Sequence, residues 1–326
     1  MKSIQQYPTR THIYQHHMLD STRWDRYMPR DDDIIITTSY KSGTTWTQAI
    51  VRELIVASYE KSVATDPSQL PLPDDQSSAW IEFIRYDTVD EIYEKIETQP
   101  HRRFLKTHLP LNGLPYFPQV RYLIVGRDPR DVFMSLWNHY HNYTEHVYQL
   151  ANKRAELLGA PFPRAPENIH EFWAEWINRG WFDWEEEGYP FWGNMYHTQS
   201  YWRYRHLDNF LFVHYHDLLT DTASEIQRIA DFLEIAVTEQ AIRTIIAETS
   251  LDTMKQRAIE QDKKPTHPDI WRGGRKTFFH KGSNGRWQSV LTDTELAMYE
   301  ATKAKVLTPS CAQWLEQGRV ALQQTV

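Results

Sequence analysis

A polar turn near the N-terminal end carries the first residues whose types and spacing suggest chemistry. It reads Ser39-Tyr40-Lys41-Ser42-Gly43-Thr44-Thr45-Trp46 and lies between a β-branched run and a segment with helical periodicity. The backbone N–H groups of such a turn, together with the positive end of the helix dipole, form an anion site. The turn therefore predicts a phosphate loop, and its plain alternative is a turn with a surface lysine.

The loop departs from the Walker pattern of nucleoside triphosphatases, which needs a glycine five residues before Gly43 and Lys-Ser/Thr directly after it. Thr38 and Thr44 occupy these positions, and the loop lysine, Lys41, precedes the glycine instead. That lysine would approach a bound anion from the other side of the loop, and Mg²⁺ need not be held. The pattern therefore argues against a nucleoside triphosphatase.

Positive charge gathers near the C-terminal end. The 24 residues from Lys263 to Arg286 hold seven lysines and arginines and one acid, Asp269, a local charge of +6 in a chain of net charge −7. A solvated face is one interpretation, and a clamp on a multiply charged anion is the other. We expect residues 255–290 to form a long basic loop.

Alternating strands and helices would position these groups. Candidate strands cover residues 34–38, 103–106, 120–125 and 210–215, and candidate helices cover 44–59, 130–141 and 223–233. Asp128 suits an N-cap, and Pro129 suits the first helical position. The alternation predicts a single α/β domain with a doubly wound, mostly parallel sheet flanked by helices, and a P-loop-like strand–loop–helix phosphate site. Ligands of such sheets bind beyond the carboxyl ends of the strands.

The composition supports one folded domain over residues 1–326, with residues 1–30 as an N-terminal extension. The chain is 40% hydrophobic and has neither a low-complexity linker nor an internal repeat, which excludes disorder and repeat architectures. Its single cysteine, Cys311, cannot form an internal disulfide, so we expect a cytoplasmic protein. No secretory signal or long apolar run is visible, and the mild acidity argues against nucleic-acid and membrane partners.

Four motifs in order resemble those of the cytosolic sulfotransferase family, which uses 3′-phosphoadenosine 5′-phosphosulfate (PAPS). They span about residues 34 to 290, so the resemblance covers nearly the whole domain. The motifs are Lys41-Ser42-Gly43-Thr44-Thr45-Trp46, Lys106-Thr107-His108-Leu109-Pro110, the run from Tyr122 to Val132 with Ser135 beyond it, and Lys281-Gly282-Ser283-Asn284-Gly285-Arg286-Trp287.

The resemblance implies sulfuryl transfer from PAPS to a hydroxyl or amine, with no metal. It places four residues at the reaction centre: His108 as general base, Lys41 at the leaving phosphate, and Lys106 and Ser135 beside them. A neutral imidazole with a pKa near 6.5 can accept a proton at neutral pH. The acceptor would be a small, hydrophobic or aromatic molecule, and the oligomeric state is left open.

The resemblance also implies a set of nucleotide contacts. Arg127 and Ser135 would bind the 3′-phosphate; an ion pair of Arg127 with Asp128 or Asp131 is the structural alternative. The other expected nucleotide contacts are Lys41, Ser42, Gly43, Thr44, Thr45, Trp46, Tyr215, Thr249, Leu251, His280, Lys281 and Gly282; Ser250 and Met254 align loosely beside them, and Tyr215 could instead be an ordinary strand-end aromatic residue.

Two positions depart from the family pattern. His280 stands where the family usually has arginine, and Gln288 stands where it usually has lysine. A histidine keeps a hydrogen-bond donor but not a permanent charge. We therefore expect 3′-phosphate binding that is weaker or more dependent on pH.

Aromatic residues are concentrated between Glu171 and Arg205, where 13 of 35 residues are Phe, Trp or Tyr. We expect residues 145–205 to be mainly helical and to lie on the acceptor side. These aromatic residues could form a helical core, wall an acceptor pocket, or do both. Four more candidates for that wall follow the third strand, namely Trp137, Tyr140, His141 and Tyr143.

The resulting hypothesis is a PAPS-dependent sulfotransferase acting on a small molecule. Its first rival is a P-loop nucleotide kinase, which the missing Walker pattern disfavours. Its second rival is a binding protein that kept the fold and lost turnover, which the presence of both Lys41 and His108 disfavours.

Overall fold

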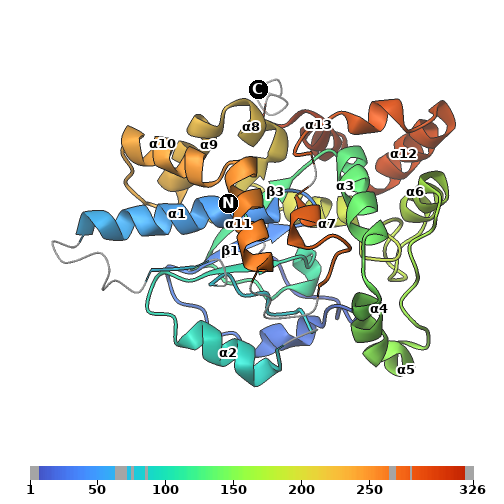
Figure 1. Cartoon of the computed structure of the whole chain (residues 1–326), viewed down its shortest axis with the longest axis horizontal. Coiled ribbons are helices and arrows are strands. Elements are labelled where there is room, and N and C mark those ends of the chain that lie inside the picture. The colour runs from blue at the N-terminus through green and yellow to red at the C-terminus, as the bar shows by residue number, and fades with distance from the viewer. Residues whose placement is uncertain are drawn as a thin grey trace, which may run out of the picture.

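The sheet at the centre of the protein has four parallel strands in the order β2–β1–β3–β4 (Figure 1). The structure is a computed structural model in which residues 7–62, 72–74, 77–84, 87–263, 269–279 and 281–319 are described. The strands are β1 (Ile34–Thr38), β2 (Phe104–Thr107), β3 (Arg121–Gly126) and β4 (Phe210–His214). This arrangement confirms the predicted parallel α/β sheet.

The strand register brings the predicted site to one edge. Thr37 of β1 lies opposite Thr107 of β2 and Ile124 of β3, and Gly126 lies opposite His214 of β4. Two strand ends differ from the prediction: Thr107 belongs to β2, and β4 stops at His214. Tyr215, expected in the strand, is the first residue of α8 (Tyr215–Thr220).

Helices cover both faces of the sheet, as Figure 1 shows. One face packs against α1 (Thr44–Ser62), α9 (Thr222–Phe232) and α10 (Glu239–Glu248). The other packs against α3 (Pro129–His141), α6 (Ile169–Asn178), α7 (Asn194–Trp202), α12 (Asp293–Val306) and α13 (Pro309–Gln317). The remaining helices are α2 (Val89–Glu97), α4 (Glu145–Ala151), α5 (Ala155–Leu158), α8, α11 (Leu251–Asp262) and the short 3₁₀ helices η1 (Ser21–Arg26), η3 (Leu111–Gly113), η4 (Asn152–Arg154), η5 (Arg275–Phe278) and η6 (Arg286–Ser289).

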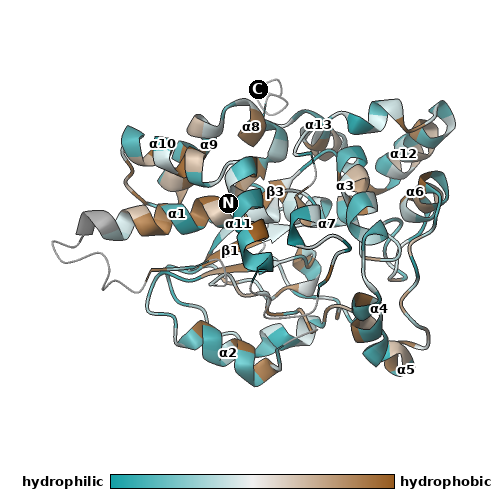
Figure 2. Cartoon of the chain, in the orientation of Figure 1, coloured by the Kyte–Doolittle hydropathy of each residue, from teal (hydrophilic) through white to brown (hydrophobic). Residues whose placement is uncertain are grey.

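Two hydrophobic cores follow from the alternation of side chains along each strand. Ile34 and Ile36 of β1 point toward α1, where Ile50 and Leu54 are fully buried. Ile35 points into the larger, aromatic core on the opposite face. Apolar and polar residues alternate around α1, α9 and α10 (Figure 2), so their apolar sides cover the sheet. The doubly wound arrangement is therefore confirmed.

The expected helix starts are also present. Asp128 accepts a hydrogen bond from the N–H of Arg130 and caps α3, and Pro129 is the first residue of that helix. Because proline lacks an N–H and has a fixed φ, it stabilises this position without losing a backbone hydrogen bond. The cap fixes where α3 leaves the end of β3.

Three regions differ from the sequence expectation. The described part of the N-terminal segment, 7–30, belongs to the domain, because Tyr14, Leu19 and Trp24 are buried in the larger core. Residues 179–193, between α6 and α7, form turns, so the segment 145–205 is less helical than predicted. Residues 255–262 lie in α11, so the basic loop begins only after that helix.

Candidate active site

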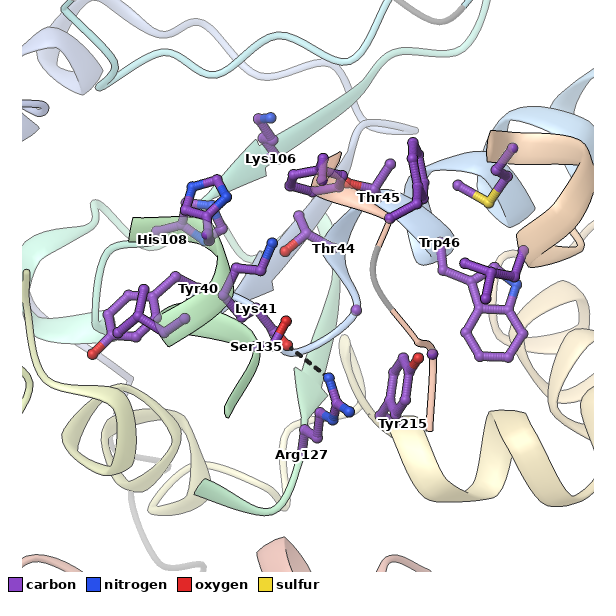
Figure 3. A pocket seen from close by; sticks show the side chains of 18 of the residues that line it. Tyr40, Lys41, Thr44, Thr45, Trp46, Lys106, His108, Arg127, Ser135 and Tyr215 are labelled. Atoms are coloured by element: carbon purple, nitrogen blue, oxygen red, sulfur yellow. Dashed lines mark hydrogen bonds between the residues drawn. The ribbon is translucent and has the colours of Figure 1, made fainter. Parts of the chain in front are cut away.

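A cavity of about 590 Å³ opens at the carboxyl ends of the strands. Each strand supplies a lining residue just beyond its end: Lys41 follows β1, His108 follows β2, Arg127 follows β3 and Tyr215 follows β4 (Figure 3). Parallel neighbours end at the same edge, so residues far apart in the chain meet there. Within the described ranges no three His, Cys, Asp or Glu side chains gather in a way that could hold a metal ion.

Most of the predicted site residues line this one cavity. They are Lys41, Gly43, Thr44, Thr45, Trp46, Lys106, His108, Arg127, Ser135, Tyr215, Thr249, Leu251, Lys281 and Gly282, with Ser250 and Met254 beside them. Ser42 is the exception, because its buried hydroxyl bonds to Ser39 Oγ at 2.8 Å and does not line the cavity. His280 lies outside the described residues.

The phosphate loop is tightly packed where the chain turns into α1. Gly43 has φ +113°, and a Cβ there would lie 2.9 Å from the Tyr215 ring, so a larger residue would be strained. Thr44 opens α1, and its hydroxyl pairs with Thr38 Oγ1 at 2.6 Å. The N–H groups of the first helical turn lack intrahelical partners. The loop therefore has the geometry of an anion site at a helix N-terminus.

Lys41 has an unusual backbone and an unusual acidity. Its φ of +62° lies in the left-handed region, and its Nζ lies 3.8 Å from the centre of the Phe278 ring. Burial, with a smaller contribution from the Arg127 charge, lowers the pKa of Lys41 to about 7. A bound anion beside this ammonium would restore its charge.

His108 is held with one defined nitrogen toward the backbone. Its Nδ1 lies 2.8 Å from the carbonyl oxygen of Thr38. Because a carbonyl can only accept, Nδ1 carries the proton, and Nε2 carries the lone pair that a general base needs. Burial first, and then the charges of Lys106 and Lys41, lower the pKa of His108 to about 3. The imidazole is therefore neutral across the physiological range.

Lys106 and Trp80 complete the surroundings of the imidazole. The Trp80 ring stands nearly perpendicular to His108, with centroids 4.8 Å apart, and Lys106 Nζ lies 4.9 Å from the centre of the Trp80 ring. Burial lowers the pKa of Lys106 to about 8, and Glu82 opposes that shift. The neutral imidazole thus lies beside two buried lysines, whose charges lower its pKa.

A carboxylate that the motifs did not reveal holds this arrangement. Glu82 is fully buried, and its Oε1 accepts hydrogen bonds from the Trp80 indole at 2.7 Å and from the Thr107 hydroxyl and the His108 N–H at 2.8 Å each. Its Oε2 accepts from the Trp24 indole at 2.8 Å. Burial raises the pKa of Glu82 while these donors lower it, and four donors suit the ionised form. An acid inside the apolar run 80–83 was the only sequence signal.

Arg127 faces the cavity, and among the described residues no carboxylate is bonded directly to it. Its guanidinium donates to Asn284 Oδ1, to the Ser283 carbonyl at 2.9 Å and to the Lys41 carbonyl at 3.3 Å. Asp128 is paired with Arg130 instead. The contacts therefore do not support the alternative that Arg127 serves a local ion pair.

Asp131 was the other possible partner of Arg127. Its carboxylate accepts the backbone N–H groups of Gly285 at 2.8 Å and Arg286 at 3.2 Å. The turn at Gly285 is thus anchored to the first turn of α3, the helix that also carries Ser135. This anchor brings Ser135, Arg127 and the turn to one side of the cavity.

The adenine-side candidates form an aromatic corner. The rings of Trp46 and Tyr215 meet edge to face with centroids 5.6 Å apart, and Arg127 lies 4.1 Å above the Tyr215 ring. The indole nitrogen of Trp46 is buried without a hydrogen-bond partner among the described residues. Tyr215 therefore contributes to the site and is not merely a strand-end residue.

The basic segment is only partly a clamp. Lys281 and Arg286 line the cavity, whereas Lys263 pairs with Glu260 and Arg275 pairs with Asp262. Both earlier interpretations thus apply to different residues of the segment. The segment also brings three aromatic residues that the motifs did not single out as site residues, Trp271, Phe278 and Phe279.

The other end of the cavity is predominantly apolar. Phe191 and Trp192 line it, whereas Phe172, Trp173 and Trp176 are fully buried behind. The aromatic segment is therefore both wall and core. Trp137, Tyr140, His141 and Tyr143 were the four residues expected at this wall, and of these only Tyr143 lines the cavity. Other described residues complete the apolar end, namely Met18, Tyr40, Trp80, Phe83, Leu136, His139, Ile270 and Trp271.

Comparison with known proteins identifies the class of the chain. The family model described as "Sulfotransferase domain" matches residues 31–308. The chain is 33% identical over 321 residues to the glycolipid sulfotransferase of Mycobacterium tuberculosis, with 94% of each chain covered. It is 26% identical to sulfotransferase 1A1 of Rattus norvegicus, with 85% of each chain covered.

Solved structures agree in fold. Mouse sulfotransferase SULT7A1, solved with PAP, superposes with a TM-score of 0.65 at 19% identity over 93% of this chain and 92% of that one. Retinol dehydratase, solved with retinol and PAP, gives 0.58 at 22% identity over 88% and 84%. The protein belongs to the sulfotransferase family and is an enzyme of the transferase class, and the kinase alternative is not favoured.

The helices of the structure were also compared with what a transmembrane span requires. Among the described residues no helix is both long enough and apolar enough to span a bilayer.

Proposed function

We propose that this sulfotransferase uses PAPS as its donor and sulfates a hydroxyl or amine of a small, hydrophobic acceptor, with His108 as general base and Lys41 at the leaving phosphate. The observation that carries the proposal is the hydrogen bond of His108: Nδ1–H donates to the Thr38 carbonyl, so the proton stays on Nδ1 and Nε2 keeps the lone pair that can accept the proton of the acceptor hydroxyl. The phosphate loop with its lysine lies in the same cavity. His108 and the phosphate loop therefore line the same cavity, as the proposed reaction requires.

The reaction balances with these groups. The acceptor O–H gives its proton to His108 Nε2 as its oxygen bonds to sulfur. The bond between sulfur and the bridging oxygen of the 5′-phosphate breaks, and its electron pair remains on that oxygen, where the Lys41 ammonium stabilises the charge. The products are a sulfate ester and adenosine 3′,5′-bisphosphate (PAP); an amine would give a sulfamate.

The donor contacts follow from the order of residues around the cavity. Backbone N–H groups from Ser42 to Thr45 would hold the 5′-phosphate at the α1 N-terminus. Arg127, Ser135 and Lys281 would hold the 3′-phosphate, because Arg127 offers a planar set of donors on that side. The Trp46–Tyr215 corner, with Thr249 and Leu251, would hold adenine.

The acceptor class follows from the apolar end of the cavity. Aromatic walls bury a hydrophobic molecule, and a few polar groups orient its reacting atom. The 33% identical relative is named a glycolipid sulfotransferase, so the panel of acceptors should include glycolipids beside phenols and alcohols. A cytoplasmic location is part of the proposal, supported by the name of a 28% identical Arabidopsis thaliana relative, cytosolic sulfotransferase 12.

The test is incubation with ³⁵S-labelled PAPS and a panel of phenols, alcohols, amines and glycolipids. We expect at least one labelled product, and we expect His108→Ala and Lys41→Ala each to lower kcat by about 10²-fold or more. His108→Ala should bind PAP within about threefold of wild type. His141→Ala is the matched control, because His141 is an exposed histidine of the same region that does not line the cavity.

Three outcomes separate the alternatives. If no acceptor is labelled but PAP binds, the protein is a nucleotide-binding homologue without turnover. If neither occurs, the proposed function is wrong. If His108→Ala retains wild-type kcat, the base has been assigned to the wrong residue.

A further inference from the structure

Lys41 combines a charged side chain with a backbone conformation that favours glycine. Among the described residues, Lys41 and Glu234 are the two non-glycine residues with positive φ. For an L-residue this conformation is unfavourable, because the Cβ atom comes close to the backbone carbonyl oxygen. Glycine would avoid that cost but would remove the ammonium that the proposed function needs. The surrounding structure must therefore hold Lys41 in place.

Two serines close the turn around Lys41. Ser39 Oγ and Ser42 Oγ lie 2.8 Å apart, so a side-chain hydrogen bond joins the residues on either side of Tyr40 and Lys41. Both serines are at most 2% exposed. A hydroxyl pair of this kind can rotate, so it needs a fixed neighbour to hold one orientation.

Asn194 supplies that neighbour. It is the first residue of α7, is 2% exposed, and its Nδ2 donates a hydrogen bond to Ser39 Oγ. The donor–acceptor pattern is thus set from outside the loop, from a residue 155 positions away. Buried amides are retained when their hydrogen bonds specify a geometry that apolar packing would not.

The N-terminus of α7 is itself firmly anchored. The fully buried carboxylate of Glu187 accepts the N–H groups of Asn194, Met195 and Tyr196 at 2.9 to 3.2 Å. Further along α7, His197 Nε2 lies 3.0 Å from Thr37 Oγ1 of β1. The helix that carries Asn194 is therefore tied to the strand that precedes the phosphate loop.

We infer that Asn194 is a positioning residue that acts through Ser39 and Ser42 to hold Lys41 in its left-handed conformation, with the ammonium aimed at the leaving oxygen. This inference rests on the proposed role of Lys41. Without the brace, Lys41 relaxes to negative φ and its side chain leaves that position. The loop N–H groups and Arg127 remain, so nucleotide binding is largely kept while the transition state loses its ammonium.

The test compares Asn194→Ala, Ser39→Ala and the double variant with wild type. We expect each single variant to lower kcat about tenfold or more, with the Kd for PAP within about threefold of wild type. The double variant should be no slower than the slower single variant, because the two residues act as one unit. Asn209→Ala is the matched control: it removes an amide hydrogen-bonded to Val120 and Tyr116 before β4, at the opposite end of the sheet, and should leave kcat unchanged.

A second readout distinguishes positioning from general damage to the fold. The charge of Arg127 acts on Lys41, and the charge of Lys41 acts in turn on His108; burial first, and then Arg127, lower the pKa of Lys41 to about 7. Release of the brace takes the Lys41 ammonium away from the leaving oxygen, so the fall of kcat/KM for PAPS through about pH 7 should be lost in Asn194→Ala and Ser39→Ala, whereas general damage to the fold would lower kcat/KM and leave that fall in place. Ser39→Ala removes only one hydroxyl, so it keeps the test valid if Asn194→Ala fails to fold.

Two results would overturn the positioning role of Asn194. Unchanged kcat in a folded Asn194→Ala or Ser39→Ala protein overturns the inference, as does a double variant whose loss is the product of the two single losses. If wild type transfers no label at all, the proposed function fails, and the brace is then tested by hydrogen exchange. Faster exchange of the Ser42 and Gly43 amides in Asn194→Ala than in Asn209→Ala would support the brace, and equal exchange would overturn it.

Discussion

At the scale of single residues, the site is defined by ionisable side chains whose burial favours the neutral form. Lys41, Lys106 and His108 all have lowered pKa values, and desolvation is the main cause for each. A buried cation without a counter-ion is costly, and an anionic ligand removes that cost. The site is therefore prepared for a polyanion, while its base stays neutral.

The first prediction concerns the pH dependence of donor use. Lys41 is charged below its pKa of about 7 and neutral above it, so kcat/KM for PAPS should fall as pH rises through about 7. Lys41→Arg should remove the part of this fall that is centred near pH 7, because arginine stays charged, and should leave any part that follows Lys106, whose pKa is about 8. On the acid side, protonation of His108 should cause no loss down to about pH 5, since its pKa is about 3.

The measurement is kcat/KM for PAPS in wild type and Lys41→Arg between pH 5 and 9. Lys41 also affects the free energy of unfolding, and its contribution to stability changes with pH in the direction opposite to the change in activity. Its folded pKa lies below the ordinary value of 10.5, so the folded state binds fewer protons between pH 7 and 10.5, and its contribution to stability rises with pH in that window. A wild-type profile identical to that of Lys41→Arg would contradict the assignment.

At the scale of elements, the carboxyl end of β2 is set by a segment outside the sheet. Residues 77–84 run beside β2, where Lys106 donates its N–H to the Ala79 carbonyl at 2.9 Å. Glu82 then joins Trp80, Thr107 and His108 through one carboxylate. This segment thereby positions His108, the proposed general base, together with one aromatic wall of the cavity.

The substitution Glu82→Gln tests whether this carboxylate positions His108, because glutamine keeps the shape of the side chain but has one acceptor oxygen instead of two. An amide cannot accept four donors, so one or two buried donors are left unpaired at a cost of about 1–3 kcal/mol. We expect kcat to fall about tenfold or more, the Tm to fall by a few degrees, and PAP to bind within about threefold of wild type. Glu94→Gln, on the exposed face of α2, is the control. Wild-type kcat in Glu82→Gln would show that the carboxylate does not position His108.

At the scale of the whole molecule, residues 269–279 and 281–286 form a cover that borders the cavity and is held to α3 and to the residues after it. Trp271 donates its indole N–H to His139 Nδ1 at 3.0 Å, Thr144 donates its N–H to the Ile270 carbonyl at 3.0 Å, and Asp131 holds the N–H groups of Gly285 and Arg286. One ligand would thus contact the phosphate loop, α3 and this cover at once. Its binding should stabilise the protein as a unit.

The corresponding prediction is ligand-dependent stability. At 100 times its Kd, PAP should add about 2.7 kcal/mol to the free energy of unfolding. Adenosine 5′-phosphate at the same concentration should add less, because Arg127, Ser135 and Lys281 lose the 3′-phosphate. Thermal unfolding with each nucleotide measures the difference, and equal shifts would contradict the assigned 3′-phosphate side.

Much of the architecture follows from local sequence. The β-branched run at residues 34–38, the glycine turn and the helical periodicity of α1 are properties of neighbouring residues, and so are the Asp128 cap and Pro129. Strand and helix periodicity, caps and glycine turns depend on interactions within a few residues, which is why these elements were predictable to within one or two positions, except that α1 continues to Ser62, three residues past its predicted end. The motifs also carried the family resemblance, because they are contiguous.

Tertiary structure alone decided what surrounds those motifs. Glu82 reaches His108, Asn194 reaches Ser39 and Phe278 reaches Lys41 across 26, 155 and 237 positions. It also turned the Ser42 hydroxyl away from the cavity and buried Tyr14 of the N-terminal segment in the core. Such contacts depend on which strand ends are neighbours and which side chains are desolvated together, and neither property is encoded in any short stretch of the chain. Local sequence therefore specified the phosphate loop and the proposed base His108, and only the fold specified the groups that position them.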